Sequence, residues 1–215
     1  MVDLLDEWKK GSHIKSIDHN RSFYTRSINS LFKFRSFIFA IILYIMAVKQ
    51  IETERILLIP YNKTLINKIQ QEDYTIFDDM NLIPAKDWPD EDVLETLPRV
   101  LINLEKVSAP TGFESWMIIA KEKNEIIGDI GFKGLPDSEG RIDLGYGIVE
   151  SARKKGYARE AASALIKWAF KDSKVLEITA KCDIKNTGSI NLLTSINFER
   201  TNIEENMIGW SLVRN

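Results

Sequence analysis

The alternation of apolar and polar residues is clearest over residues 141–149, where it has the period of two that is typical of a β-strand. One face of this predicted strand carries Ile142, Leu144, Tyr146 and Ile148, and the opposite face carries Asp143, Gly145 and Gly147. Two further apolar runs, 116–120 and 126–132, lie on either side of a polar turn and predict a hairpin. Other strands are expected at 55–60, 175–182, 198–201 and 207–213.

Helical spacing is clearest over residues 90–106, where apolar residues recur every three or four positions. The residues on this face are Val93, Leu97, Val100, Leu101 and Leu104. Pro98 predicts a kink or a break in the stretch, because proline lacks the main-chain N–H that a helix interior requires. Further helices are expected at 63–80, 157–171 and 189–196, so the domain belongs to the mixed α/β (α+β) class.

The first 49 residues differ from the rest of the chain, and we expect them to form an extension to a domain at 50–215. Their main feature is an apolar run of about 13 residues, 36–48, with basic residues on both sides. About 20 apolar residues are needed to cross a bilayer, so the run is short for a membrane anchor. Two interpretations stay open: residues 36–48 touch a membrane, or translation starts at Met46 and residues 1–45 are not native or are disordered.

Charge and residue usage exclude several classes of function. The net charge is -2 and the pI is about 5.8, which argues against broad binding of nucleic acid or anionic lipid. The single cysteine, Cys182, cannot form an intrachain disulfide, which favours the reducing cytoplasm, and no Cys/His cluster is present to hold a metal. Both histidines, His13 and His19, precede residue 50, so a general base in the domain must be a carboxylate, a tyrosine, a lysine or a chain of waters.

Residues 148–160 place a strand, a short basic turn and the start of a helix in direct succession. The first N–H groups of a helix lack partners within it, and together with the helix dipole they attract anions such as a pyrophosphate. Gly156 would let the main chain approach such a group closely, and Ala158 would leave the approach uncrowded. The surrounding positive charges are Arg153, Lys154, Lys155 and Arg159. Taken alone, the same pattern also fits a solvated basic turn before an ordinary helix.

The spacing Arg153-x-x-Gly156-x-Ala158 between a strand and a helix resembles the pyrophosphate-binding signature of the GNAT superfamily of N-acetyltransferases. Residues 143–148, Asp-Leu-Gly-Tyr-Gly-Ile, resemble its RimJ/RimL-like branch, which contains the N-terminal acetyltransferases of ribosomal proteins. Residues 186–198 resemble the late helix of that branch and the end of that helix. The similarity therefore runs in order through the whole of the expected domain.

The resemblance implies a mixed, mostly antiparallel central sheet flanked by helices, with acetyl-CoA as co-substrate. The pyrophosphate would lie on the turn formed by Arg153, Lys154, Lys155, Gly156, Tyr157 and Ala158. The pantetheine arm would pair like an added strand with the chain ending at Ile148 and Val149, whose N–H groups would polarise the thioester. Asn186 and Ser189 would contact the coenzyme, and the alternative is that they only cap a helix.

The resemblance also implies candidates for proton transfer and acceptor binding. The candidate general bases are the carboxylates Asp143, Glu150 and Glu160, with Asp143 the first choice, although Asp143 and Glu160 could be ordinary strand and helix residues. Many family members protonate the departing thiolate with a tyrosine at the position of Leu193, so Ser189 or a water would do so here. We expect Trp88 and Tyr146 near the acceptor, with packing in the core as the alternative for both.

These features predict a cytoplasmic N-acetyltransferase that moves an acetyl group directly from acetyl-CoA to a primary amine. The acceptor would be a protein N-terminus or a small molecule, and the enzyme a monomer or a homodimer. We expect no metal and no nucleic-acid partner, and membrane contact only if residues 36–48 supply it. The alternatives are an acetyl-CoA-binding sensor without catalysis and a membrane-tethered interaction protein.

Overall fold

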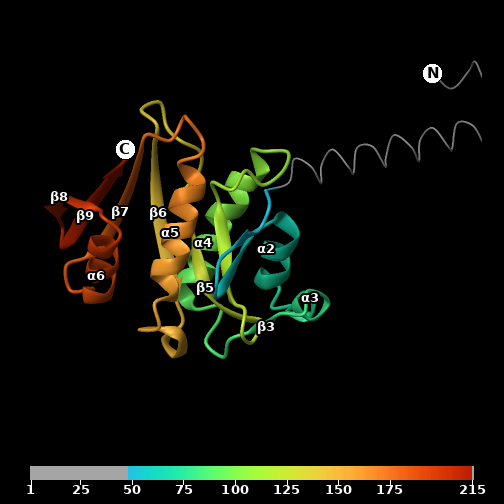
Figure 1. The fold of residues 1–215 in the computed structure, drawn as a ribbon. Coiled ribbons are helices and arrows are strands. Elements are labelled where there is room, and N and C mark those ends of the chain that lie inside the picture. Colours follow the sequence, from blue (N-terminus) through green and yellow to red (C-terminus); the bar gives the residue numbers. More distant parts are fainter. Residues whose placement is uncertain (1–47, 215) are drawn as a thin grey trace, which may run out of the picture. The chain divides into compact units, whose positions relative to one another are not determined.

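The computed structural model describes residues 48–214 and builds them around one sheet (Figure 1). The order of its strands is β1-β2-β4-β5-β6-β7-β9-β8, and β3 pairs with β5 off this path. The strands are β1 (Ile51–Glu52), β2 (Ile56–Pro60), β3 (Ile83–Pro84), β4 (Ser115–Ala120), β5 (Glu125–Phe132), β6 (Arg141–Ile148), β7 (Glu177–Asp183), β8 (Glu199–Glu204) and β9 (Met207–Val213). All pairs are antiparallel except β6 with β7 and β3 with β5, so the expected mixed, mostly antiparallel sheet is confirmed.

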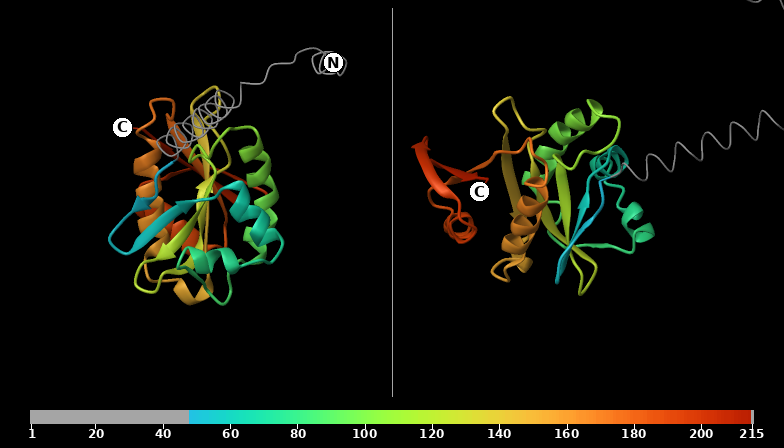
Figure 2. Two further views of the ribbon diagram at one scale, coloured as in Figure 1. Left: turned by 90° about the vertical axis from the view of Figure 1, so that its right-hand side faces the viewer. Right: turned by 45° about the horizontal axis from the view of Figure 1, so that its top comes forward.

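Helices cover both faces of this sheet (Figure 2). α5 (Tyr157–Ala169) packs on one face, where it contacts β2, β5 and β6, and α4 (Glu91–Glu105) lies with α2 (Lys63–Gln70) on the other. The shorter helices are α3 (Thr75–Asp79), α6 (Thr187–Ser195) and the 3-10 helix η2 (Glu150–Ala152). The helix expected over 63–80 is therefore two helices, because Glu72 between them adopts a left-handed backbone with a φ of 56°.

α4 runs through Pro98 without the break that this residue suggested. Pro98 removes the hydrogen bond to the carbonyl of Leu94, but Leu94 is 43% exposed, so water can reach that side of the helix. The buried residues Val93, Leu97, Val100 and Leu104 hold the helix against the protein core. Asp90 caps its start, where Oδ1 accepts a hydrogen bond from the N–H of Val93 at 3.0 Å.

The face of the sheet under α5 is packed with apolar side chains. α5 presents Ala161, Ala162 and Ala169 to it, and because these residues are small and fully buried the helix lies close to the strands. β6 alternates as predicted, with its apolar residues on this buried face. Trp168 of α5 adds an aromatic contact to Trp116 of β4, with ring centroids 5.5 Å apart.

β6 and β7 pair only over the first half of their length. Their register runs from Arg141 opposite Glu177 to Leu144 opposite Ala180, and beyond this point the two strands continue without pairing. The other edge of β6 stays paired with β5 as far as Ile148. The second half of β6 therefore has an open edge in the middle of the sheet.

The apolar run at 36–48 and the alternative start at Met46 lie outside the described residues, apart from Val48. The first described strand, β1, begins at Ile51. Within residues 48–214, no helix is long and apolar enough to cross a bilayer.

Candidate active site

The turn between β6 and α5 exposes the first N–H groups of the helix. Lys154 and Gly156 both adopt left-handed backbones, with φ of 61° and 84°, and these values turn the chain sharply into α5. Gly156 is the N-cap residue and offers no side chain to the first turn, where the first helical bond runs from the N–H of Glu160 to the carbonyl of Gly156. The preceding N–H groups, on Tyr157 and Ala158, consequently have no acceptor within the helix and form an anion site.

Three of the four basic residues predicted around this site precede the helix, whereas Arg159 lies within α5 and its guanidinium is 3.5 Å from the carbonyl of Ser195. Arg153, Lys154 and Lys155 are exposed and adjoin the open turn of the helix. Arg153 is also tied to the end of β6, because its Nε donates a hydrogen bond of 2.9 Å to the carbonyl of Ile148. The turn therefore combines unpaired N–H groups with positive side chains, and one of those side chains is held in place by the sheet.

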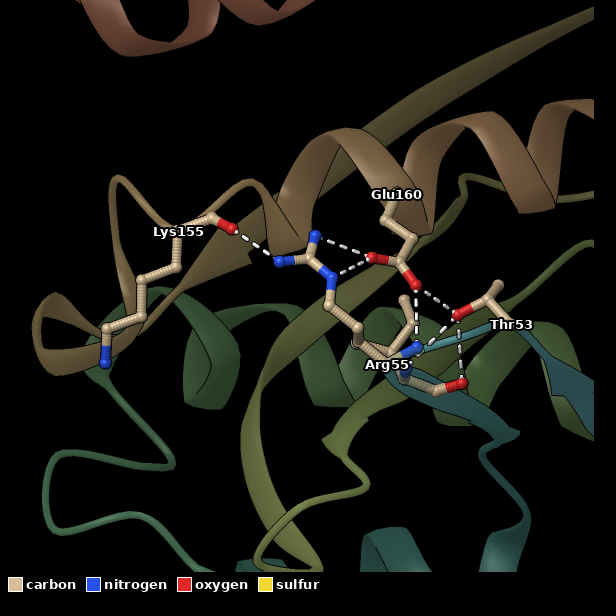
Figure 3. Close-up of polar contacts among 5 residues, drawn as sticks. Thr53, Arg55, Lys155 and Glu160 are labelled. Atoms are coloured by element: carbon tan, nitrogen blue, oxygen red, sulfur yellow. Dashed lines mark hydrogen bonds and ion pairs between the residues drawn. The ribbon is translucent and has the colours of Figure 1, made fainter.

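Arg55, just before β2, fixes this turn from a distant part of the sequence (Figure 3). Its guanidinium donates to the carbonyl of Lys155 at 2.9 Å and pairs with the carboxylate of Glu160 at 2.6 Å. The same group lies 5.0 Å from the centre of the Tyr157 ring. Nothing local in the sequence marks this contact, because Arg55 lies about a hundred positions away from its partners.

Glu160 is fully engaged in that cluster. Its Oε1 accepts hydrogen bonds from the Thr53 hydroxyl at 2.6 Å and from the Arg55 N–H at 3.0 Å, and its Oε2 accepts from the Arg55 guanidinium. Burial opposes ionisation, but these hydrogen bonds outweigh it and hold the pKa of Glu160 below its usual value. A carboxylate with both oxygens occupied and a lowered pKa is a poor base, so this geometry argues against the predicted base role of Glu160 and favours a structural one.

The open edge of β6 presents two main-chain N–H groups. Main-chain bonds run from the N–H of Lys133 to the carbonyl of Asp143 and from the N–H of Val149 to the carbonyl of Ile127. The main-chain N–H and C=O groups of odd-numbered residues in this segment therefore point towards β5. The N–H groups of Tyr146 and Ile148 therefore point to the side where β7 has separated. The coenzyme contact predicted for Ile148 is compatible with this open N–H, whereas the N–H of Val149 already donates to Ile127 and is not free to polarise a thioester.

Tyr146 and Ser189, predicted for separate roles, meet beside this open edge. The Tyr146 hydroxyl oxygen is buried, and no hydrogen bond of good geometry reaches it from the described residues. Burial raises the pKa of Tyr146, an effect that neighbouring Ser189 opposes and Cys182 of β7 increases. Asn186 is the N-cap of α6, where its Oδ1 accepts a bond of 3.0 Å from the N–H of Ser189. A protonated hydroxyl therefore lies where β6 and β7 diverge.

The other face of the same strands contains a small hollow under α4, with a cavity volume of about 150 Å³. Gly145 and Gly147 lie at its base, and a Cβ added to either would meet no atom within 4 Å, so the space above them is open. The charged residues that line the hollow are Asp90, Asp92, Arg99, Asp129 and Lys133. The hollow and the Tyr146 hydroxyl thus approach β6 from opposite faces.

Asp129 of β5, like Arg55, is not among the residues predicted from the sequence. It lies opposite Gly147 and accepts hydrogen bonds from the Tyr61 hydroxyl and from Trp88 Nε1, the latter at 2.8 Å. Burial raises the pKa of Asp129 to about 7, although both hydrogen bonds act in the opposite direction. The available signal was a lone carboxylate inside the apolar run 126–132.

The remaining predicted residues lie around the hollow rather than in it. Asp143 does not line it, and its Oδ2 pairs with the Lys133 ammonium at 2.6 Å while Oδ1 is buried without a partner among the described residues. Trp88 is only 5% exposed and packs edge-on against Phe77. Trp88 therefore affects the hollow through its hydrogen bond to Asp129, and its side chain does not line the hollow.

Comparison with known proteins identifies relatives in sequence and in fold. Residues 55–199 match the family described as the acetyltransferase (GNAT) domain. The uncharacterized N-acetyltransferase YjdG of Bacillus subtilis (strain 168) is 35% identical over 148 residues, which are 69% of this chain and 88% of the relative.

Two solved structures share the fold at low identity. Ribosomal-protein-S5-alanine acetyltransferase from Vibrio fischeri gives a TM-score of 0.58 at 18% identity, covering 77% of this chain and 97% of that one. The ribosomal L7/L12 α-N-protein acetyltransferase RimL, in complex with coenzyme A, gives a TM-score of 0.56 at 14% identity, covering 77% and 98%.

Proposed function

The chain belongs to the GNAT acetyltransferase family and is an N-acetyltransferase, and from this premise we propose that it moves the acetyl group of acetyl-CoA directly to a primary amine. The observation that carries the proposal is the adjacency of two open main-chain elements. The unpaired first turn of α5 follows directly on the open edge of β6, so one long ligand can bind both.

The two elements suit different parts of acetyl-CoA. The N–H groups of Tyr157 and Ala158 would bind the pyrophosphate, with Lys154 and Lys155 adding positive charge. The N–H groups of Tyr146 and Ile148 would pair with the amides of the pantetheine arm as a neighbouring strand does. RimL, which shares this fold, has been solved in complex with coenzyme A, and this supports coenzyme binding by the fold.

The thioester would then lie where β6 and β7 diverge, beside the Tyr146 hydroxyl. The amine nitrogen attacks the carbonyl carbon, the C–N bond forms, and the C–S bond breaks to leave a thiolate. Because its pKa is raised, the Tyr146 hydroxyl stays protonated at neutral pH and can give its proton to that thiolate. Ser189, beside Tyr146, would hold or relay that proton. The residue predicted as the acid would therefore act through Tyr146.

The experiment that tests this function is release of free coenzyme A thiol from acetyl-CoA by the full chain, with and without an amine. The panel contains a lysine-free peptide with a free N-terminal serine and 1,4-diaminobutane, so that both predicted acceptor types are represented. Amine-dependent release supports the proposal. Binding of acetyl-CoA without release by any amine would contradict it and would favour a non-catalytic sensor.

A further inference from the structure

The reaction needs a group that takes a proton from the amine, and Asp129 lies where it can do so. Its main chain pairs with Gly147, in the stretch of β6 where the open edge lies. Its carboxylate belongs to the hollow on the α4 face. Tyr146 lies across from Ile130 and Ile130 across from Trp116, so the Tyr146 side chain is on the face where Trp116 contacts α5. A group at Asp129 and a group at Tyr146 can therefore act on one reaction centre at β6 from its two sides.

The hollow around Asp129 has the size of an amino group and a few attached atoms. Its volume of about 150 Å³ corresponds to roughly five water molecules at ~30 Å³ each. The space exists because Gly145 and Gly147 carry no side chain, and it is bordered on the far side by α4. It can admit the amino end of an acceptor, while the remainder of the acceptor stays outside.

The carboxylate of Asp129 is held in one orientation and keeps room for a ligand. An ionised carboxylate offers about four lone-pair sites, and the bonds from Tyr61 and Trp88 use one on each oxygen. Both donors are buried, so the orientation is fixed by the core. Sites on Asp129 are left for a proton or an ammonium group that enters the hollow.

Charged groups of both signs surround Asp129. Asp90, Asp92, Arg99 and Lys133 line the hollow with it, and the hydroxyl of Tyr61, just after β2, donates to it. The two carboxylates and the two positive side chains balance in number, but Asp90 acts on Asp129 directly by raising its pKa. With burial, this brings the pKa of Asp129 to about 7, where a general base is most effective at neutral pH.

We propose that Asp129 is the general base of the reaction and that the hollow beside it binds the protonated amino group of the acceptor. The inference rests on the proposed function, because it assigns a role within that transfer. The acceptor enters as an ammonium, and Asp129 takes one proton and passes it to solvent. The free amine attacks the thioester, and Tyr146 gives its proton to the departing thiolate. The nitrogen then loses its second proton, which restores the Tyr146 hydroxyl.

The test is the pH dependence of kcat/KM for the two probe amines, the serine peptide and 1,4-diaminobutane, in the full chain. Wild-type activity should rise through an apparent pKa of about 7. The near-isosteric Asp129→Asn should lower kcat by about 100-fold or more and abolish this rise, with acetyl-CoA binding unchanged. Asp78→Asn is the matched control, since Asp78 is exposed on α3, away from the hollow.

A measurement without turnover separates the base from a structural role. In protein carrying ¹³C-labelled aspartate, one carboxyl resonance should titrate near pH 7 in the wild type and be missing in Asp129→Asn. Unchanged acetyl-CoA affinity in the same variant would show that it is folded.

Two results would overturn the inference while leaving the proposed function in place. The first is an Asp129→Asn protein that keeps its rate and its pH profile. The second is loss of the rise in Asp143→Asn instead, which would assign the base to Asp143. A wild-type protein that does not bind acetyl-CoA, or that binds it but acetylates neither probe, would instead remove the proposed function and the inference with it.

Discussion

Glu160 shows how one carboxylate can connect a coenzyme-binding turn to the first strands. Its bonds to Thr53 and Arg55 hold the end of the turn, and Arg55 reaches the carbonyl of Lys155 on the other side (Figure 3). A neutral side chain at position 160 would keep the shape but lose most of the attraction to Arg55. The residue therefore supports the site without entering the chemistry.

This arrangement predicts how stability depends on pH. The pKa of Glu160 is lower in the folded protein, so its contribution is present above the usual value of 4.5 and disappears as the pH falls through the folded value. Glu160→Gln should lower the free energy of unfolding by about 1 kcal/mol at neutral pH and reduce the loss on acidification. Urea unfolding at a series of pH values measures this. Equal acid sensitivity of the two proteins would contradict the assignment.

Tyr146 gives a second prediction at this scale. Tyr146→Phe removes the proton donor but keeps the ring in the core, so kcat should fall by about 10- to 100-fold while the KM for acetyl-CoA changes little. Steady-state thiol release measures both parameters. Ser189→Ala should have the smaller effect, because Ser189 acts through Tyr146. A variant with wild-type kcat would show that water or another group protonates the thiolate.

The predicted coenzyme-binding turn has a local signal in the sequence, whereas the groups proposed for proton transfer do not. Gly156 and its basic neighbours form a local motif, so spacing alone identifies them. Asp129 and Arg55 have no local motif, and their roles come from strand pairing and from a contact between distant segments. Asp143 and Glu160 are candidate bases because they are carboxylates near the motif, and in the structure each is paired with a cationic side chain.

At the scale of the element, β6 uses its glycines to shape the hollow. A Cβ at Gly147 would enter open space, whereas a Cβ at Gly131 would lie 2.4 Å from the main chain of Ser115. Gly147→Val should therefore leave stability unchanged or higher, since valine suits a strand, while it raises the KM for the amine by about tenfold or more. The affinity for acetyl-CoA should stay the same.

Gly131→Ala is the matched comparison for that prediction. Its Cβ can be accommodated only if the main chain moves, so we expect a loss of roughly 1–3 kcal/mol in the free energy of unfolding. Denaturant unfolding of both variants, together with amine kinetics, separates a filled acceptor site from a disturbed sheet. Unchanged amine kinetics in Gly147→Val would show that the acceptor does not use this hollow.

Most elements could be predicted from their own patterns, and the differences have local causes. Periodicity located β4, β5, β6 and α5, because each has a long apolar face. The stretch 63–80 keeps helical spacing across Glu72, where a left-handed backbone ends α2, and spacing does not reveal such a turn. The short elements β3 and η2 are too brief to show any period.

At the scale of the whole molecule, the proposed mechanism depends on where the sheet separates. β6 is bonded on one side to β5 and is open on the other beyond Leu144, and the chain then turns directly into α5. The coenzyme-binding elements are thus consecutive in sequence, whereas the groups around the acceptor come from β5, β6 and α4. Strand order and register create this second set, which is why the sequence alone did not assemble it.

The most direct test of the central claim is isothermal titration of acetyl-CoA into the full chain and into Gly156→Val. A side chain at Gly156 is strained by the φ of 84°, and its Cβ would lie 3.3 Å from the Arg55 guanidinium that holds the turn, so Arg55 must give way. Gly134→Ala is the control, because Gly134 also has a positive φ but lies in a loop with room for a methyl group. We predict binding by the wild type and the control, and an affinity at least about tenfold weaker in Gly156→Val. Absence of binding in the wild type, or equal affinity in all three proteins, would contradict a coenzyme site at this turn.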